Sequence, residues 1–235
     1  MIRKTFCILP RVGIKKEQSI WSQGIHTWKD FLENDVKGIS RKNKLLYNRL
    51  IQKANEELWK ENSSYFIKII PSPETWRLYN FFKDQCCFVD IEGNNIIGIY
   101  DGVETKTLIR HINFDRRLLK KELEKYKLII TYNGGAYDLP KIKKYFDFLP
   151  NIPHIDLKTA CRRCGLTGGL KAIEKKLNID RPSHLYGSAA DCYRAFLASG
   201  RREYLEGIVE YNEQDCVSLK PIMDHCYSKL SRLRD

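Results

Sequence analysis

Residues 86–93 read CCFVDIEG and place two acidic residues, Asp90 and Glu92, two positions apart within an apolar run. Because successive side chains of a β-strand point to opposite faces, a strand here sets both carboxylates on one face and turns the apolar residues toward a core. Neighbouring carboxylates repel each other unless a positive charge lies between them, and their oxygens are ligands that suit Mg²⁺ or Mn²⁺. The segment therefore predicts half of a metal site, which acidic residues elsewhere are expected to complete.

The composition indicates a globular protein with an excess of positive charge. Of the 235 residues, 43% are hydrophobic and 11% aromatic, enough for one full core with a smaller appendage. Lys and Arg number 41 against 29 Asp and Glu, and the net charge of +12 favours polyanionic partners, although an ordinary basic protein has the same balance. The eight cysteines form no regular framework, and no apolar run has the length of a secretion signal or membrane span. We expect a reducing, cytoplasmic setting.

Residues 1–85 are predicted to form a basic helical region. Gly13 and Gly24 bracket a short helix over 15–23, and Thr27 can cap the helix that follows. The spacing is similar to a helix-hairpin-helix element, whose backbone amides hold a phosphate, but a small packing hairpin fits it at least as well.

Residues 86–235 are predicted to form an α/β domain. After the first strand, strands are expected at 96–100 and 104–109, joined by tight turns into an antiparallel meander. An amphipathic helix over 114–126 then leads into a buried strand at 127–132. This order predicts a mixed β-sheet flanked by helices, with acidic residues at the strand ends.

Two further acidic motifs follow. The segment NGGAYD (133–138) comes directly after the last of these strands, so Asp138 can both cap the next helix and face the strand that carries Asp90. Tyr211 and Asp215 are four residues apart in a long helical pattern, so they lie on one helix face. Taken alone, the first motif fits an ordinary capping turn and the second a surface pair.

Together, the three motifs resemble those of the DEDD superfamily of RNase H-like exonucleases, most closely the branch with tyrosine in its third motif (DEDDy). The first motif of the superfamily, Asp-x-Glu, matches Asp90 and Glu92. The second, Asn followed by an aromatic–Asp pair, matches Asn133 with Tyr137 and Asp138. The third, Tyr-x-x-x-Asp, matches Tyr211 and Asp215.

Two more segments, HIDL (154–157) and GLKAIE (169–174), are similar to the bacterial and archaeal YprB-type group of ribonuclease H-like proteins, whose members often carry an N-terminal helical region. Gly93 stands where the superfamily usually has threonine. That departure concerns a substrate contact and not the metal site.

The residues by themselves predict metal-assisted phosphodiester hydrolysis. Four carboxylates can bind two divalent ions about 4 Å apart, which is the arrangement used for in-line displacement at phosphorus. They belong to Asp90, Glu92, Asp138 and Asp215. Tyr211 carries a phenol, which with a pKa of about 10 is a poor base at neutral pH, so we expect it to orient the attacking water. The family resemblance alone implies 3'-to-5' release of nucleoside monophosphates.

Two other interpretations fit the same residues. A nucleic-acid-binding scaffold that has kept the fold and lost activity would bind oligonucleotides regardless of Mg²⁺ or Mn²⁺. A structure-specific endonuclease on the same fold would give internal cuts, which an end-labelled strand reveals. In each case the expected partner is DNA or RNA, and for the exonuclease it is a single-stranded end.

Substrate contacts are predicted around the second motif and in a glycine-rich loop. Asn133 and Tyr137 belong to the motif, and Tyr137 with the lysines after it can supply stacking and charge for a single strand. The loop over 165–171 leads into a helix, so its amides and Lys171 can meet a phosphate, although a connecting loop without contacts fits equally.

Three more residues have the chemistry of metal ligands. Asp156 precedes a helix expected to begin at Leu157, and it fits an N-cap better than a metal ligand. Cys161 and Cys164 have the spacing of half a zinc or iron–sulfur site, but no second pair accompanies them, and reduced thiols are the commoner outcome.

Overall fold

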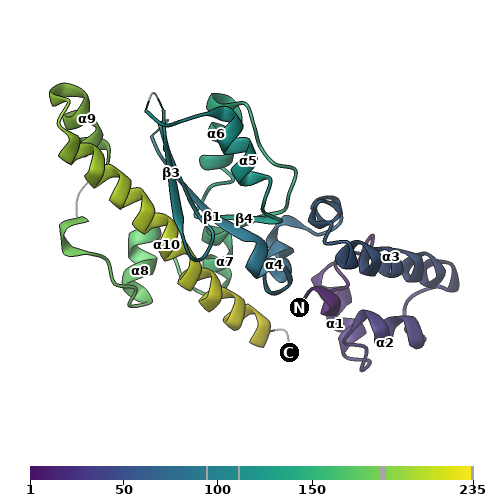
Figure 1. Ribbon diagram of the computed structural model, residues 1–235. Helices are drawn as coiled ribbons and strands as arrows, with labels where there is room; N and C mark the ends of the chain where they lie inside the picture. The colour runs from purple at the N-terminus through teal and green to yellow at the C-terminus, as the bar shows by residue number, and fades with distance from the viewer. Residues whose placement is uncertain (94, 111, 186–188, 234–235) are drawn as a thin grey trace. The chain divides into compact units, whose positions relative to one another are not determined.

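The computed structural model describes residues 1–93, 95–110, 112–185 and 189–233, and it divides into two compact units, Met1–Lys83 and Asp84–Asp235 (Figure 1). The first unit is helical in its regular structure. It comprises α1 (Ile14–Trp21), α2 (Trp28–Glu33), α3 (Arg41–Trp59) and α4 (Tyr79–Phe82), with 3₁₀ turns at Ile2–Lys4, Ser63–Lys68 and Ser72–Leu78. Another 3₁₀ turn, Lys83–Gln85, lies at the boundary.

A buried ion network holds the first unit together. Glu17 of α1 accepts hydrogen bonds from the hydroxyl of Thr5 (2.6 Å) and from the guanidinium of Arg77 (2.7 Å), which also pairs with Glu74 (2.6 Å). Buried charges are costly unless they are paired and hydrogen-bonded, so this network ties α1 to the Ser72–Leu78 segment. The predicted cap of α2 is confirmed, because Thr27 forms a capping box with Asp30.

The second unit is built on a five-stranded mixed sheet in the order β3-β2-β1-β4-β5. The strands are β1 (Cys86–Glu92), β2 (Ile96–Tyr100), β3 (Thr105–Ile109), β4 (Leu128–Thr131) and β5 (His154–Asp156). The first three form the predicted antiparallel meander, and β4 lies parallel to both β1 and β5. The α/β fold class, a mixed sheet flanked by helices, is confirmed.

Helices cover both faces of the sheet (Figure 1). On one face, apolar residues of β1 and β2 pack with α5 (Arg116–Leu123) and α6 (Asp138–Phe146) in one hydrophobic cluster. On the other face, α10 (Arg202–Arg232) packs across β1, β2 and β3 and against α7 (Leu157–Arg163), α8 (Leu170–Lys176) and α9 (Ala189–Ser199). The odd-numbered residues of β1 therefore enter the α5–α6 core, and Asp90 and Glu92 face the α10 side.

Gly98 allows α10 to approach the sheet closely. It lies on β2 directly opposite Asp90 of β1. A Cβ atom at Gly98 would lie 2.6 Å from the Sγ of Cys216 and would collide with the side-chain oxygen of Asn212, both on α10. Only a residue without a side chain leaves room for this helix at its present distance from β1.

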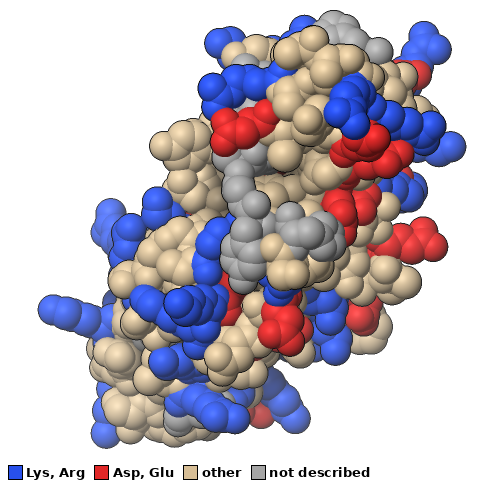
Figure 2. All heavy atoms as spheres, turned by 90° about the vertical axis from the view of Figure 1, so that its left-hand side faces the viewer, with Lys and Arg blue, Asp and Glu red and all other residues tan. Residues whose placement is uncertain are grey.

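The surface carries charges of both signs. Figure 2 shows Lys and Arg side chains spread across one face of the molecule with Asp and Glu among them, not gathered into a single patch. No helix in the described part of the chain is both long enough and apolar enough to span a membrane.

Replacing Gly98 with alanine is expected to destabilise the second unit by about 1–3 kcal/mol, the usual cost of overpacking a close contact. Thermal unfolding followed by circular dichroism measures the effect. Gly207→Ala is the matched control, because that glycine lies in α10 with open space around its Cβ position and is expected to gain stability from better helix propensity. A Gly98→Ala protein as stable as the wild type would contradict the close approach.

Candidate active site

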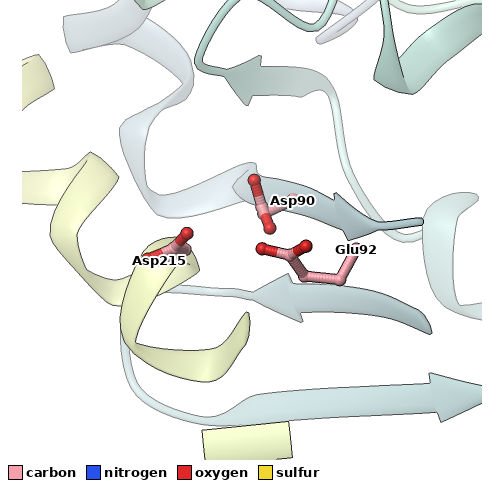
Figure 3. A group of neighbouring side chains, drawn as sticks. All are labelled: Asp90, Glu92 and Asp215. Atoms are coloured by element: carbon pink, nitrogen blue, oxygen red, sulfur yellow. The ribbon is translucent and has the colours of Figure 1, made fainter. Parts of the chain in front are cut away.

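Three carboxylates from two elements converge on the α10 side of the sheet. Asp90 and Glu92 come from β1 and Asp215 from α10, and each offers a carboxylate oxygen within 4.8 Å of the others (Figure 3). Among the described residues, no other group of three or more acidic, histidine or cysteine side chains comes as close together. The structure thus brings together three of the four acids that the sequence singled out, although Asp90 and Asp215 are far apart in the chain.

Asp138, the fourth acid, lies at the edge of this group and is bound to the strand itself. The parallel pairing of β1 with β4 ends at Phe88 and Ile130, so the backbone N–H of Ile91 lies beyond it and donates to the Asp138 carboxylate (3.1 Å). Asp138 is buried and close enough for its charge to affect Asp90. Its expected capping role is wrong, because Tyr137 occupies the N-cap position of α6 and Asp138 is the first helical residue.

The turn before Asp138 is shaped by Asp156. Its carboxylate accepts hydrogen bonds from the backbone N–H groups of Asn133 (2.9 Å) and Gly135 (3.4 Å), and also caps α7 through Lys158 N–H (3.0 Å). The predicted N-cap role of Asp156 is confirmed. Asn133 itself takes a left-handed conformation (φ 63°), which asparagine tolerates better than most residues.

The space around Gly134 also restricts this turn. A Cβ atom at Gly134 would lie 2.8 Å from a carboxylate oxygen of Asp138. Tyr137 is 59% exposed at the start of α6. The substrate-binding roles assigned to Asn133 and Tyr137 stay predictions.

Burial disfavours the charged forms of Asp90, Glu92 and Asp138, and repulsion from neighbouring acids adds to this effect. Burial, followed by the charges of the three neighbouring acids, raises the pKa of Asp90 well above its ordinary value. Burial and the charge of Asp215 raise the pKa of Glu92 to about 7, and burial raises that of Asp138 to about 6. The surroundings therefore compensate the negative charge of these carboxylates only poorly, which is a common feature of catalytic sites.

Two cations partly compensate the cluster at Asp215. The ammonium of Lys171 and the guanidinium of Arg181 both form ion pairs with the Asp215 carboxylate. The same two groups lie over the ring of Tyr211, at 4.6 and 5.0 Å from its centroid. The sequence predicted that Lys171 meets a phosphate, whereas in the structure its ammonium is paired with the Asp215 carboxylate. The sequence analysis did not identify Arg181 as a site residue.

Tyr211 lies among the acids as a neutral phenol. Burial and the nearby charges of Asp215 and Glu92 raise its pKa to about 12. This value agrees with the interpretation that Tyr211 is a poor base.

Asn212 is a second site residue that the sequence analysis missed. Its side-chain amide donates to the Asp90 carboxylate (2.8 Å) and lies near the Asp90 carbonyl (3.3 Å), and Asn212 is fully buried. Its position three residues before Asp215 on one helix face was an available signal. Arg181 carried no such signal, because its segment has no regular spacing relative to the acids.

The cysteine pair lies apart from the acids. Cys161 and Cys164 are buried beside Cys226 of α10, with 3.6 Å between the sulfurs of Cys161 and Cys226. The Cys164 thiol points to the Cys226 carbonyl at 3.8 Å. All eight cysteines are free thiols.

The donor set fits a divalent cation. It consists of carboxylate oxygens only, the type that Mg²⁺ and Mn²⁺ prefer, and its geometry leaves several of these oxygens within reach of one position. The presence of Lys171 and Arg181 at Asp215 indicates that the site attracts positive charge. A metal bound there would be held by Asp90, Glu92 and Asp215.

Comparison with known proteins agrees with this geometry. The family model described as the RNase_H superfamily matches residues 87–227, more than half of the chain and all three acidic motifs. The chain belongs to the RNase_H superfamily. Members of this superfamily generally hydrolyse nucleic acids, and its nucleases use divalent metals. The RNase H-like fold expected from the motifs is thereby confirmed.

This member of the RNase_H superfamily is also similar to a bacterial protein. It is 31% identical over 115 residues to the uncharacterized protein YprB of Bacillus subtilis (strain 168). The match covers 43% of this chain and 28% of that protein, so the chain spans little more than a quarter of the relative's length. No solved structure matches the chain.

The raised pKa of Glu92 predicts a pH-dependent stability in chelator. Because the folded state holds this proton up to about pH 7 and the unfolded chain releases it near the ordinary value of 4.5, unfolding becomes easier as the pH rises between these values. Glu92→Gln removes this penalty, so its melting temperature should exceed that of the wild type by a margin that grows from pH 4.5 to pH 7.5. Melting curves in EDTA across this range measure the margin.

The matched control for this experiment is Glu104→Gln, at an exposed glutamate that precedes β3. Its melting temperature should follow that of the wild type at every pH. A constant difference between Glu92→Gln and the wild type would show that burial of this carboxyl does not affect its protonation.

Proposed function

We propose that this protein is a metal-dependent nuclease that hydrolyses phosphodiester bonds of DNA or RNA by a two-metal mechanism. Within that class we propose a 3'-to-5' exonuclease of the DEDDy type acting on single-stranded ends in the cytoplasm. The observation that carries the proposal is the convergence of Asp90, Glu92 and Asp215, three carboxylates from distant segments, in a chain of the RNase_H superfamily.

The DEDDy assignment is supported by the third motif. Tyr211 and Asp215 share the two cations Lys171 and Arg181, so the phenol lies in the same charged environment as the acid. The single turn of helix between them keeps this arrangement rigid. The direction of cleavage rests on the family resemblance of the motifs.

The carboxylates act as a fixed anionic frame. Two divalent ions, Mg²⁺ or Mn²⁺, held by Asp90, Glu92, Asp138 and Asp215 would stabilise the charge that develops at phosphorus during in-line displacement. Asn212 keeps the Asp90 carboxylate in one orientation through its hydrogen bond of 2.8 Å. Ile91 does the same for Asp138 through its backbone N–H.

Tyr211 serves as a hydrogen-bonding group for the attacking water. With a pKa of about 12 it keeps its proton at neutral pH, so it orients the water and does not remove a proton from it.

Asp215→Asn is expected to reduce hydrolysis of an oligonucleotide at least about 10³-fold, since metal ions stabilise phosphoryl transfer by several kcal/mol. Asp90→Ala should have the same effect with the fold retained, as judged by circular dichroism. Asp224→Asn is the matched control, an exposed aspartate on the same helix as Asp215, and should retain wild-type activity. A fully active Asp90→Ala or Asp215→Asn protein would refute the proposal.

The products from end-labelled strands separate the proposed reaction from its alternatives. With 5'-labelled single-stranded DNA and RNA and Mn²⁺, a 3'-to-5' exonuclease gives a ladder that shortens progressively, and EDTA abolishes it. Discrete internal cuts at structured positions would identify an endonuclease. Oligonucleotide binding that is unaffected by metal, without any cleavage, would identify a silent scaffold.

A further inference from the structure

A pocket lies next to the acidic cluster, formed by α8, the segment after it and Tyr211 of α10. Its volume is about 600 Å³, a size typical of sites for small ligands. The lining includes the cationic side chains of Lys171, Lys175 and Arg181 and the apolar side chains of Ile179 and Leu185. The pocket therefore combines positive charge with apolar surface, immediately beside Asp215.

Arg181 is the buried cation of this pocket. Its side chain is only 7% exposed, and one terminal nitrogen is bound to Glu174 (3.0 Å) and Asp215. The other two guanidinium nitrogens, Nε and Nη1, are enclosed and have no acceptor among the described residues. Since buried donors are almost always paired, these nitrogens indicate that a ligand with acceptor oxygens completes the site.

The charge of the pocket favours a phosphate. Arg181 keeps two donor nitrogens without an acceptor among the described residues, and hydrogen bonds from a guanidinium to phosphate oxygens are strong because both groups are charged. Two acids also line the pocket, but Glu174 is already bound by Arg181, and Asp180 is exposed. Among the described residues, no acid pairs with the Lys175 ammonium, so this charge is available to a ligand as well.

We propose that this pocket is a nucleotide subsite, in which Arg181 and Lys175 bind the phosphate of the nucleotide next to the cleaved bond. The proposal rests on the proposed nuclease function, whose substrate and product both carry such a phosphate. The apolar side chains of Ile179 and Leu185 lie against the nucleoside. The position of Arg181 between this pocket and Asp215 links binding of the nucleotide to the acidic cluster.

The test compares two adjacent lysines of one short helix. Lys175 lines the pocket, whereas Lys176 does not and donates instead to the Thr167 carbonyl (2.7 Å). Both are exposed, so Lys175→Gln and Lys176→Gln remove the same charge from the same surface. Binding of adenosine 5'-monophosphate to the full chain in EDTA, measured by isothermal titration calorimetry, reports on the pocket without any hydrolysis.

Lys175→Gln is expected to weaken this binding about fivefold, the effect of one exposed ion pair, with Lys176→Gln within twofold of the wild type. Arg181→Gln should weaken it about tenfold or more, because hydrogen bonds to a buried charge are stronger. Arg181→Lys should restore part of the loss. Adenosine, which lacks the phosphate, should bind with no difference among these variants.

Equal affinities for Lys175→Gln and Lys176→Gln, or a wild type that does not bind the nucleotide, would overturn the subsite. If Arg181→Gln does not fold, the two lysine variants decide the question alone. A wild type that cleaves oligonucleotides without these binding differences keeps the nuclease function and loses the subsite. Binding with these differences, but without cleavage in Mg²⁺ or Mn²⁺, refutes the nuclease function and leaves a nucleotide-binding pocket.

Discussion

The close contact between α10 and the sheet at Gly98 is the constraint on which the site depends. It lets Asn212 reach Asp90 across a strand position that has no side chain, and it brings Asp215 to the two acids of β1. Any larger residue on β2 at that position would move the helix outward, and the carboxylates would separate. The geometry of the acidic cluster is thus determined by packing between a helix and a strand, which is stiff because protein interiors are densely packed.

The acidic cluster is kept at a cost in stability. Burial and repulsion raise the pKa values of Asp90, Glu92 and Asp138, so the isolated protein favours their protonated forms more than water would. Lys171 and Arg181 form ion pairs with Asp215, and the charges of Lys171 and Lys141 favour the ionised form of Glu92, but together these cations offset only part of the effect. Uncompensated negative charge that lowers the stability of the fold is expected where a protein prepares a site for a positively charged ligand.

The second unit carries the acidic cluster, and the first unit is organised separately around its own core. Glu17 and Arg77 form a fully buried pair there, which holds that unit together from within. The match to the RNase_H superfamily begins at residue 87 and leaves the first unit outside it. The phosphate-binding role suggested for the hairpin of α1 and α2 stays a prediction.

The sequence by itself determined the strand alternation and the acidic motifs. Two-residue periodicity assigned Asp90 and Glu92 to one face of β1, and a four-residue spacing assigned Tyr211 and Asp215 to one face of a helix, because both rules are local. Only the tertiary structure decided the role of Gly98, the anchoring of Asp138 by Ile91 in place of a cap, and the position of Arg181. These depend on how segments distant in the chain pack together, and no local periodicity encodes that distance.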